Sequence, residues 1–106
     1  MFLHIPAKHG VLGLVRSIAL DVAKKGATCN AICPGFSDTD LAETAIKRIM
    51  EHFDMDRATA AAKVVAGNPR GDLVSTDEIA KTTLFLASEG ASAINGHALS
   101  VSGGEI

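Results

Sequence analysis

A strong net charge and a long apolar run are both missing from this sequence. Its 106 residues carry a formal net charge of −2 at pH 7, so a basic nucleic-acid-binding surface is not expected. No apolar run approaches the length of a membrane span. Lys8 and His9 also interrupt the start of the chain, where a secretory signal needs a continuous apolar stretch. We therefore expect a soluble cytoplasmic protein that contacts neither nucleic acid nor membrane.

Cysteine is also scarce, with two in the whole chain. Cys29 and Cys33 stand in the stretch ATCNAIC, whose small and apolar residues predict a strand. In an extended strand the two would be about 13 Å apart, at roughly 3.3 Å per residue, which is too far for a disulfide. The sequence also lacks the second ligand pair that a structural zinc needs. We expect both to be small core residues in a reducing compartment, and we expect no metal site.

What the sequence does contain begins with an amphipathic helix pattern over residues 6–25. Its apolar residues spread beyond one face, and the main stripe consists of Val11, Leu14, Val15, Ile18 and Val22. Pro6 is tolerated in the first turn, because the N–H that it lacks would have no partner there. Gly26 follows Lys24 and Lys25 and is predicted to end the helix.

Two short strands are predicted, at residues 27–33 and 96–101. Pro34 and Gly35 end the first strand, because proline cannot donate to a strand ladder. Both strands lack the alternation of apolar and polar residues that is typical of a sheet with one exposed face. This pattern is expected where helices cover both faces of a sheet.

Three further helices are predicted between these strands. Two occupy about 40–52 and 55–66, and the loop signal GNPRGD follows them. The third spans about 76–88, because Ser75 and Glu78 have the spacing of a capping box. This order of elements indicates a parallel α/β fold. Two strands cannot form a stable sheet alone or cover the first helix, so the pattern predicts the second half of a larger α/β domain.

Two stretches of the chain resemble a known family. AKHGVLGLVRSIALDVAKKGATCNAICPGFSDTDL and the C-terminal GHALSVSGG resemble the C-terminal half of the short-chain dehydrogenase/reductases, from about His4 to Gly104. The TCNAICPG segment and the loop after it resemble the D-3-hydroxybutyrate dehydrogenases most. The resemblance implies that residues 1–106 form a partial domain. That part is the C-terminal half of a Rossmann-like doubly wound parallel sheet, with the N-terminal half absent.

The resemblance also implies a function. It indicates a homo-oligomeric oxidoreductase that uses NAD or NADP and transfers a hydride between nicotinamide and a small hydroxy acid or alcohol, such as 3-hydroxybutyrate. The glycine-rich dinucleotide fingerprint and the catalytic serine of the family belong to the absent half. The chain alone is therefore expected to bind the cofactor weakly at best and to be inactive.

Two site residues come from the family motif Tyr-x-x-x-Lys in the first helix. In the family the tyrosine is the general acid/base, and the lysine lowers its pKa and holds the ribose hydroxyls of the cofactor. Lys8 matches the lysine, and His4 stands at the position of the tyrosine. The resemblance thus makes His4 and Lys8 catalytic candidates and Lys8 a cofactor-binding candidate.

Three further cofactor-binding candidates come from a second family motif, Pro-Gly-x-x-x-Thr. Pro34, Gly35 and Thr39 match it. By the resemblance they pass along the nicotinamide and offer hydrogen bonds to its carboxamide or to the phosphates. The following loop, from Asp40 to about Asn68, matches the mobile substrate lid, and a connection of that length is usually functional.

Alternative interpretations stay open for these residues and for the whole chain. A histidine beside Lys8 could accept a proton but would rarely hold one to donate. Alternatively, His4 belongs to an altered N-terminus and Lys8 is a solvated first-turn lysine. The chain itself could be a non-catalytic α/β oligomerisation or interaction module, or the product of a truncated reading frame.

Other polar residues have structural interpretations. Ser37, Asp38 and Asp40 are predicted to cap the helix that follows them. Asn30 is predicted to be buried and hydrogen-bonded within its strand. His97 is predicted to have a structural role in the last strand rather than to bind a ligand.

Overall fold

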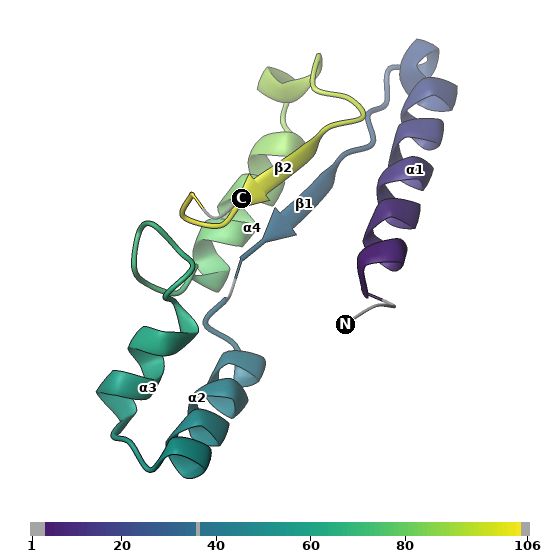
Figure 1. Cartoon of the computed structure of the whole chain (residues 1–106). Coiled ribbons are helices and arrows are strands. Elements are labelled where there is room, and N and C mark those ends of the chain that lie inside the picture. Colours follow the sequence, from purple (N-terminus) through teal and green to yellow (C-terminus); the bar gives the residue numbers. More distant parts are fainter. Residues whose placement is uncertain (1–3, 36, 105–106) are drawn as a thin grey trace. The chain divides into compact units, whose positions relative to one another are not determined.

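The computed structural model describes residues 4–35 and 37–104, with the backbone alone for residues 4–8. Helices precede the first strand and lie between the first and the second (Figure 1), and this confirms the predicted α/β class. The elements are α1 (His4–Val22), η1 (Ala23–Lys25), β1 (Ala31–Pro34), α2 (Asp40–Phe53), α3 (Arg57–Val64), α4 (Thr76–Leu86), η2 (Glu89–Ala91) and β2 (Ala98–Val101), where η marks a short 3-10 helix. Within the described ranges, no helix combines the length and the apolar character needed to cross a membrane.

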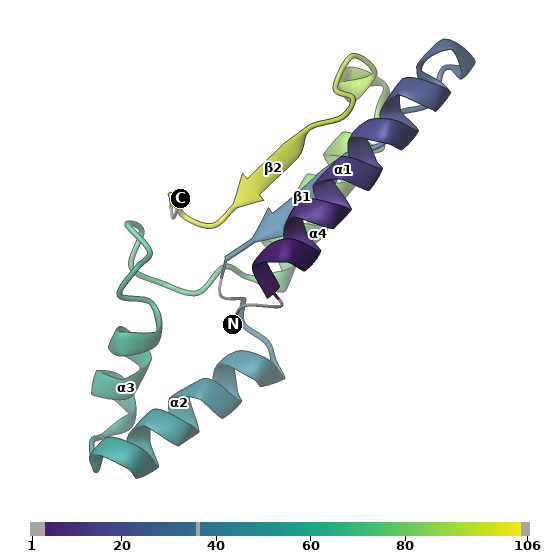
Figure 2. The ribbon, with the colours of Figure 1, turned by 45° about the vertical axis from the view of Figure 1, so that its right-hand side comes forward.

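Strands β1 and β2 pair in a two-stranded sheet and run in the same direction (Figures 1 and 2). The N–H of Ala31 donates to the carbonyl of His97 at 2.8 Å, and the N–H of Gly35 donates to that of Val101 at 3.1 Å. The partners advance in step along both strands, as they do in a parallel ladder. The predicted parallel pairing is therefore confirmed.

Strand β1 begins at Ala31, later than the predicted start at residue 27. Before it, side-chain amides accompany a backbone hydrogen bond from the N–H of Gly96 to the carbonyl of Cys29 at 2.8 Å. Asn95 Oδ1 accepts from the N–H of Cys29 at 2.9 Å, and Asn30 Oδ1 accepts from the N–H of His97 at 3.0 Å. The prediction of a hydrogen-bonded Asn30 is confirmed, although its side chain is half-buried. His97 lies directly before β2. Its side chain is exposed, and its backbone forms the hydrogen bonds described above.

The chain divides into two compact units. Unit 1 comprises Met1–Ile32 with Thr82–Leu99, and unit 2 comprises Cys33–Lys81 with Ser100–Ile106. In unit 1, Asn95 Nδ2 donates to the carbonyl of Ala19 at 2.9 Å. Ala19 is buried, and a Cβ added at Gly96 would lie 3.4 Å from its Cβ. The turn at residues 95–96 therefore packs closely against the C-terminal half of α1.

Large apolar side chains of unit 1 are exposed. On α1, Val11 is 55% exposed, Leu14 60% and Ile18 38%, and on the second half of α4 Leu84 is 71% exposed. Three residues of the predicted apolar stripe therefore meet solvent. This agrees with the expectation that two strands cannot cover the first helix.

In unit 2, helices α2 and α3 form a hairpin around buried side chains that include Ala42, Ile46 and Ala60. The guanidinium of Arg57 on α3 forms a two-pronged ion pair with the carboxylate of Glu43 on α2. Asp56 caps α3, because its Oδ1 accepts from the N–H of Thr59 at 2.9 Å. Both predicted helices are confirmed.

The prediction that both cysteines are core residues is wrong. Cys33 is exposed and Cys29 is half-buried. That prediction assumed helices over both faces of the first strand, whereas the face that carries Cys33 meets solvent. Both are free thiols in the structure.

Candidate functional site

The segment after the carboxyl end of β1, described at Gly35 and at residues 37–39, is held at two points in unit 2. The N–H of Gly35 bonds to Val101 on β2, and the N–H of Asp38 donates to the carbonyl of Val74 at 2.9 Å. Ser37 also forms a parallel bridge with Val74, which is 1% exposed. Among the described residues of this segment, Gly35 is therefore the last that pairs with β2, and Ser37 and Asp38 are held by the buried Val74. Ligands of open α/β sheets bind at the carboxyl ends of the strands, where this segment lies.

Thr39 occupies the N-cap position of α2, but its side chain makes no capping hydrogen bond. Its N–H and its hydroxyl both donate to the carbonyl of Ser37, at 2.8 and 3.4 Å. The Ser37 hydroxyl donates to the carbonyl of Gly35 at 3.2 Å. The predicted cap by Ser37, Asp38 and Asp40 is therefore wrong, because Ser37 turns back onto the preceding backbone.

The chemistry of this segment suits a neutral polar ligand. Thr39 is exposed. In the sequence it stands between two acidic residues, Asp38 and Asp40. An anion bound to the Thr39 hydroxyl would be repelled by both carboxylates, whereas an amide or a carbonyl would not. Among residues 9–35 and 37–104, no cluster of His, Cys, Asp and Glu side chains could hold a metal ion.

The other predicted site residues, His4 and Lys8, belong to unit 1, whereas Pro34, Gly35 and Thr39 belong to unit 2. The backbones of His4 and Lys8 lie at the start of α1, one helical turn apart. Their side chains lie outside the described residues. The catalytic and cofactor-binding roles of all five residues therefore stay predictions.

A cluster of polar contacts surrounds Arg70 in the loop before α4. Its Nη1 and Nη2 bind the two carboxylate oxygens of Glu78, at 2.5 and 3.0 Å. Nη2 also donates to the carbonyl of Leu73 at 3.0 Å, and Nε pairs with the carboxylate of Asp72. The N–H of Arg70 donates to the carbonyl of Gly103 at 3.1 Å. Arg70 thus joins its own loop, the first turn of α4 and the turn after β2.

Glu78 is held from a second side by Ser75. The N–H of Ser75 donates to Glu78 Oε1 at 3.0 Å, and the N–H of Glu78 donates to Ser75 Oγ at 3.0 Å, which confirms the predicted capping box. The hydrogen bond from Arg70, followed by those from Ser75, lowers the pKa of Glu78 from 4.5 to about 2. Hydrogen bonds to Glu78 and Asp72 raise the pKa of Arg70. Both groups therefore carry their charges at neutral pH.

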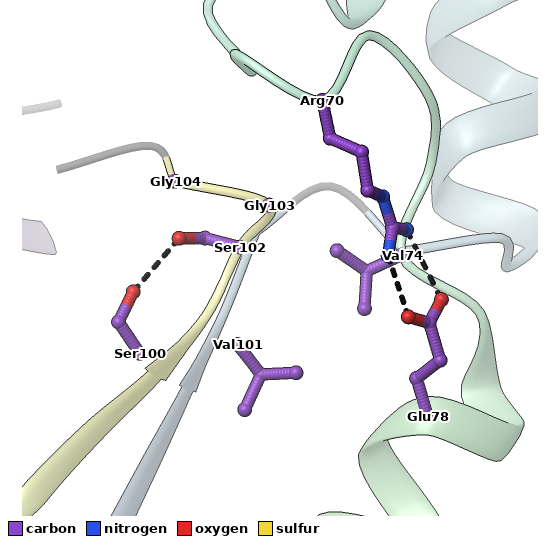
Figure 3. Close-up of a pocket in the computed structure, with 8 residues that line it drawn as sticks. All are labelled: Arg70, Val74, Glu78, Ser100, Val101, Ser102, Gly103 and Gly104. Atoms are coloured by element: carbon purple, nitrogen blue, oxygen red, sulfur yellow. Dashed lines mark hydrogen bonds and ion pairs between the residues drawn. The ribbon is translucent and has the colours of Figure 1, made fainter.

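A pocket of about 300 Å³ lies beside this cluster (Figure 3). The ion pair of Arg70 and Glu78 borders it on one side, and the side chain of Val101 points toward that pair from β2. The hydroxyls of Ser100 and Ser102, 2.8 Å apart, point away to the opposite side of the strand. The lining of the pocket consists of Arg70, Val74, Glu78, Ser100, Val101, Ser102, Gly103 and Gly104. Because two carboxylates already engage the guanidinium, the pocket does not offer an available positive charge to an anionic ligand.

Sequence reasoning missed the part that Arg70 plays. The stretch GNPRGD signals a loop, and a loop has no periodicity from which the partner of a charged residue can be deduced. The capping box identified Glu78 as a partner of Ser75 only. The remaining signal was an arginine followed by acidic residues at positions 72 and 78, a pattern that is too common in surface loops to single out one ion pair.

Comparisons with known proteins give consistent matches over almost the whole chain. A family model described as Enoyl-(Acyl carrier protein) reductase matches residues 3–105. The chain is similar to a putative ketoacyl reductase of Streptomyces coelicolor, with 34% identity over 98 residues, and the match covers 92% of this chain and 38% of that protein. It is also similar to a D-beta-hydroxybutyrate dehydrogenase of Rhizobium meliloti, with 33% identity over 102 residues, 95% of this chain and 40% of the relative.

A solved structure shows the same likeness in three dimensions. The crystal structure of an actinorhodin polyketide ketoreductase variant with NADPH superposes with a TM-score of 0.81 at 32% identity. That match covers 93% of this chain and 38% of the ketoreductase. The chain therefore spans about two fifths of the length of the proteins that it matches.

Proposed function

Because the chain belongs to the short-chain dehydrogenase/reductase family, we propose that it carries part of the domain of an NAD(P)-dependent oxidoreductase. The reaction moves a hydride from the carbinol carbon of a small hydroxy acid to the nicotinamide ring, while the hydroxyl proton passes to a general base. The products are the oxo acid and the reduced cofactor, and the reverse direction reduces the oxo acid. The observation that carries the proposal is the anchoring of Gly35, Ser37 and Asp38 at the carboxyl end of β1.

These anchored residues and Thr39 support a contact with the nicotinamide end of the cofactor. Thr39 presents an exposed hydroxyl, and the acidic residues Asp38 and Asp40 on either side favour a neutral carboxamide over a phosphate. Pro34 and Gly35 bring the backbone to this point from β1. Of the two contacts that the family resemblance left open, we therefore propose the carboxamide.

The catalytic part of the proposal rests on His4 and Lys8. Lys8 holds the ribose hydroxyls of the cofactor, and His4, one turn before it on α1, accepts the hydroxyl proton of the substrate. An imidazole near its ordinary pKa of about 6.5 accepts a proton at neutral pH more readily than it donates one. We therefore propose that oxidation of the hydroxy acid is the favoured direction.

For the substrate we propose a small 3-hydroxy acid such as 3-hydroxybutyrate. The similarity to a D-beta-hydroxybutyrate dehydrogenase supports this choice. The similarity to ketoacyl and polyketide ketoreductases supports a second candidate, a 3-oxoacyl group on a larger carrier. Both candidates place the reacting oxygen at the third carbon of an acyl chain. A comparison of the rates with short and with long substrates distinguishes them.

The test uses a fused enzyme, in which the part of the Rhizobium meliloti relative that this chain does not match is joined to residues 1–106. We expect formation of reduced cofactor with 3-hydroxybutyrate and NAD or NADP. Lys8→Ala should lower kcat/KM by about 10²-fold or more, as expected for loss of a positioning contact. Lys24→Ala, an exposed lysine on η1, is the matched control and should leave the rate unchanged.

Two results would contradict the proposal. One is a folded fused enzyme that binds NAD or NADP but oxidises neither 3-hydroxybutyrate nor longer 3-hydroxyacyl substrates. The other is an equal loss of rate in Lys8→Ala and Lys24→Ala. Activity confined to the longer substrates would favour the ketoacyl alternative.

A second candidate function is a non-catalytic oligomerisation module. The exposed apolar side chains of unit 1, on α1 and on the second half of α4, favour it. Association of like chains is compatible with either function, so a homo-oligomer is part of both proposals. The fused enzyme separates them, because a module without catalytic residues would associate but stay inactive.

A further inference from the structure

Arg70 has a set of contacts that the proposed function does not use. Its guanidinium binds both carboxylate oxygens of Glu78 and the carbonyl of Leu73, and its N–H binds the carbonyl of Gly103. Its N–H also donates to Asn68 Oδ1 at 2.8 Å, so the side chain of Asn68 closes the same loop. The guanidinium thereby connects the loop to the first turn of α4, and the backbone N–H connects it to the distant turn after β2, all within unit 2.

The next link runs from Leu73 to the candidate site. Leu73 precedes Val74, and the carbonyl of Val74 accepts from the N–H of Asp38 while Val74 bridges Ser37. Val74 is buried, so its place is set by packing as well as by these hydrogen bonds. With Leu73 held by the guanidinium and Glu78 held at the start of α4, the stretch 73–78 has a fixed point at each end.

We propose that Arg70 is a positioning residue for the candidate site. By fixing residues 73–78, it holds Val74 where that residue anchors Ser37 and Asp38, directly before Thr39. Arg70 touches neither the reacting atoms nor the cofactor in this scheme. The link to the cofactor rests on the proposed function, whereas the link from Arg70 to Asp38 rests on the described contacts alone.

Arginine is the residue that this arrangement requires. Its planar guanidinium binds a carboxylate with two parallel hydrogen bonds and keeps a further N–H for the carbonyl of Leu73. A lysine could contact Glu78 or Leu73 but could not span both with fixed geometry. Arg70→Lys should therefore keep the charge and lose part of the anchoring.

Unit 2 offers a matched control in Arg57. It also forms a two-pronged ion pair with a glutamate, Glu43, and is likewise exposed. Its pair joins α2 to α3 within their hairpin, whereas the guanidinium of Arg70 holds Leu73, next to the residue that anchors Asp38. Arg57→Gln removes a similar ion pair at a place that does not anchor Asp38.

The first experiment measures amide hydrogen exchange on the full chain. Arg70→Gln should raise the exchange rate at Asp38 by about tenfold or more through local opening, and Arg70→Lys should raise it less. Amides within α2 and α3 should keep their protection. Arg57→Gln should leave Asp38 at the wild-type rate. Glu78→Gln, which removes the other half of the pair, should reproduce the effect of Arg70→Gln.

The result that overturns the anchoring is wild-type exchange at Asp38 in both Arg70→Gln and Glu78→Gln. An equal rise at Asp38 and throughout α2 and α3 in Arg70→Lys would also overturn it, because the residue would then stabilise unit 2 as a whole.

The second experiment measures cofactor kinetics in the fused enzyme. Arg70→Gln should raise KM for NAD or NADP by about 10- to 100-fold with kcat little changed, because the anchored contact holds the cofactor in the ground state and transition state alike. Arg70→Lys should recover part of that loss. If Asp38 loses its protection while KM stays at the wild-type value, the positioning role is overturned. An inactive fused enzyme would count against the proposed function, and the exchange experiment would still decide whether Arg70 anchors Asp38.

Discussion

Single residues set the acid sensitivity of unit 2, and Glu78 is the main example. Its pKa is about 2 in the folded chain, lowered by Arg70 and Ser75, against an ordinary value of 4.5. A carboxyl with a lowered folded pKa stabilises the fold above its unfolded pKa, and the contribution is lost as the pH falls through the folded one. The stabilisation by Glu78 should thus be complete above pH 4.5 and fade toward pH 2.

Urea unfolding as a function of pH checks this prediction. Between about pH 6 and pH 3, the unfolding midpoint of the wild-type chain should fall more than that of Glu78→Gln, which has no charge to lose. Glu51→Gln, an exposed glutamate on α2, is the control and should follow the wild type. Parallel pH profiles for Glu78→Gln and the wild type would show that the pair with Arg70 does not contribute.

The proposed function predicts that a substitution at His4 can raise the reaction rate rather than lower it. In the fused enzyme, His4→Tyr should raise kcat/KM by about 10²- to 10⁴-fold, the range for a positioned acid/base group. Adding Lys8→Ala to that variant should abolish most of the gain, because in the proposed function the lysine would tune the tyrosine and hold the ribose. The measurement is kcat/KM for 3-hydroxybutyrate across pH. An unchanged rate in a folded, cofactor-binding variant would mean that position 4 is not the acid/base position.

At the scale of elements, the turn after β2 depends on glycine. Gly103 has a φ of 67°, and a Cβ there would overlap the side-chain amide of Asn68. We expect Gly103→Ala to lower the free energy of unfolding by about 1–3 kcal/mol, because it adds backbone strain to a steric clash. Gly13→Ala is the control: nothing lies within 4 Å of its added Cβ, and it lies within α1.

Chemical denaturation of both variants measures the difference. Gly13→Ala should be neutral or should stabilise the chain by up to about 1 kcal/mol, because alanine is the better helix former. Equal stability of Gly103→Ala and the wild type would mean that the turn relaxes at no cost and that Asn68 does not hold it closely.

At the scale of the whole molecule, the exposed apolar side chains of unit 1 predict self-association. Leu14 on α1 and Leu84 on α4 are 60% and 71% exposed, and contiguous apolar surface tends to be covered by a partner. We expect the chain to sediment as a dimer or larger species, and Leu14→Glu or Leu84→Glu to shift it toward monomer. Leu41→Glu, at a leucine of unit 2 that is 73% exposed, is the control. A monomer at all concentrations, or equal dissociation by Leu41→Glu, would contradict this prediction.

Local sequence patterns predicted the elements well, because each pattern acts over a few residues. The capping box of Ser75 and Glu78 marked the start of α4. Gly26 marked the end of η1, the short 3-10 helix that follows α1, and adopts a φ of 76° there. The α/β order and the family resemblance followed from the same kind of information. Periodicity, caps and glycine positions can be read from neighbours in the chain.

Contacts between distant segments were decided only by the tertiary structure. The side chains of Asn30 and Asn95 join the two segments before β1, beside a backbone hydrogen bond between Gly96 and Cys29. Arg70 reaches Glu78, Leu73 and Gly103 because the loop before α4 passes beside the turn after β2. No sequence spacing predicts these partners, because a hydrogen bond between distant residues depends on the path of the chain between them. The sequence by itself determined which helices and strands form, and the tertiary structure decided which polar side chains join them.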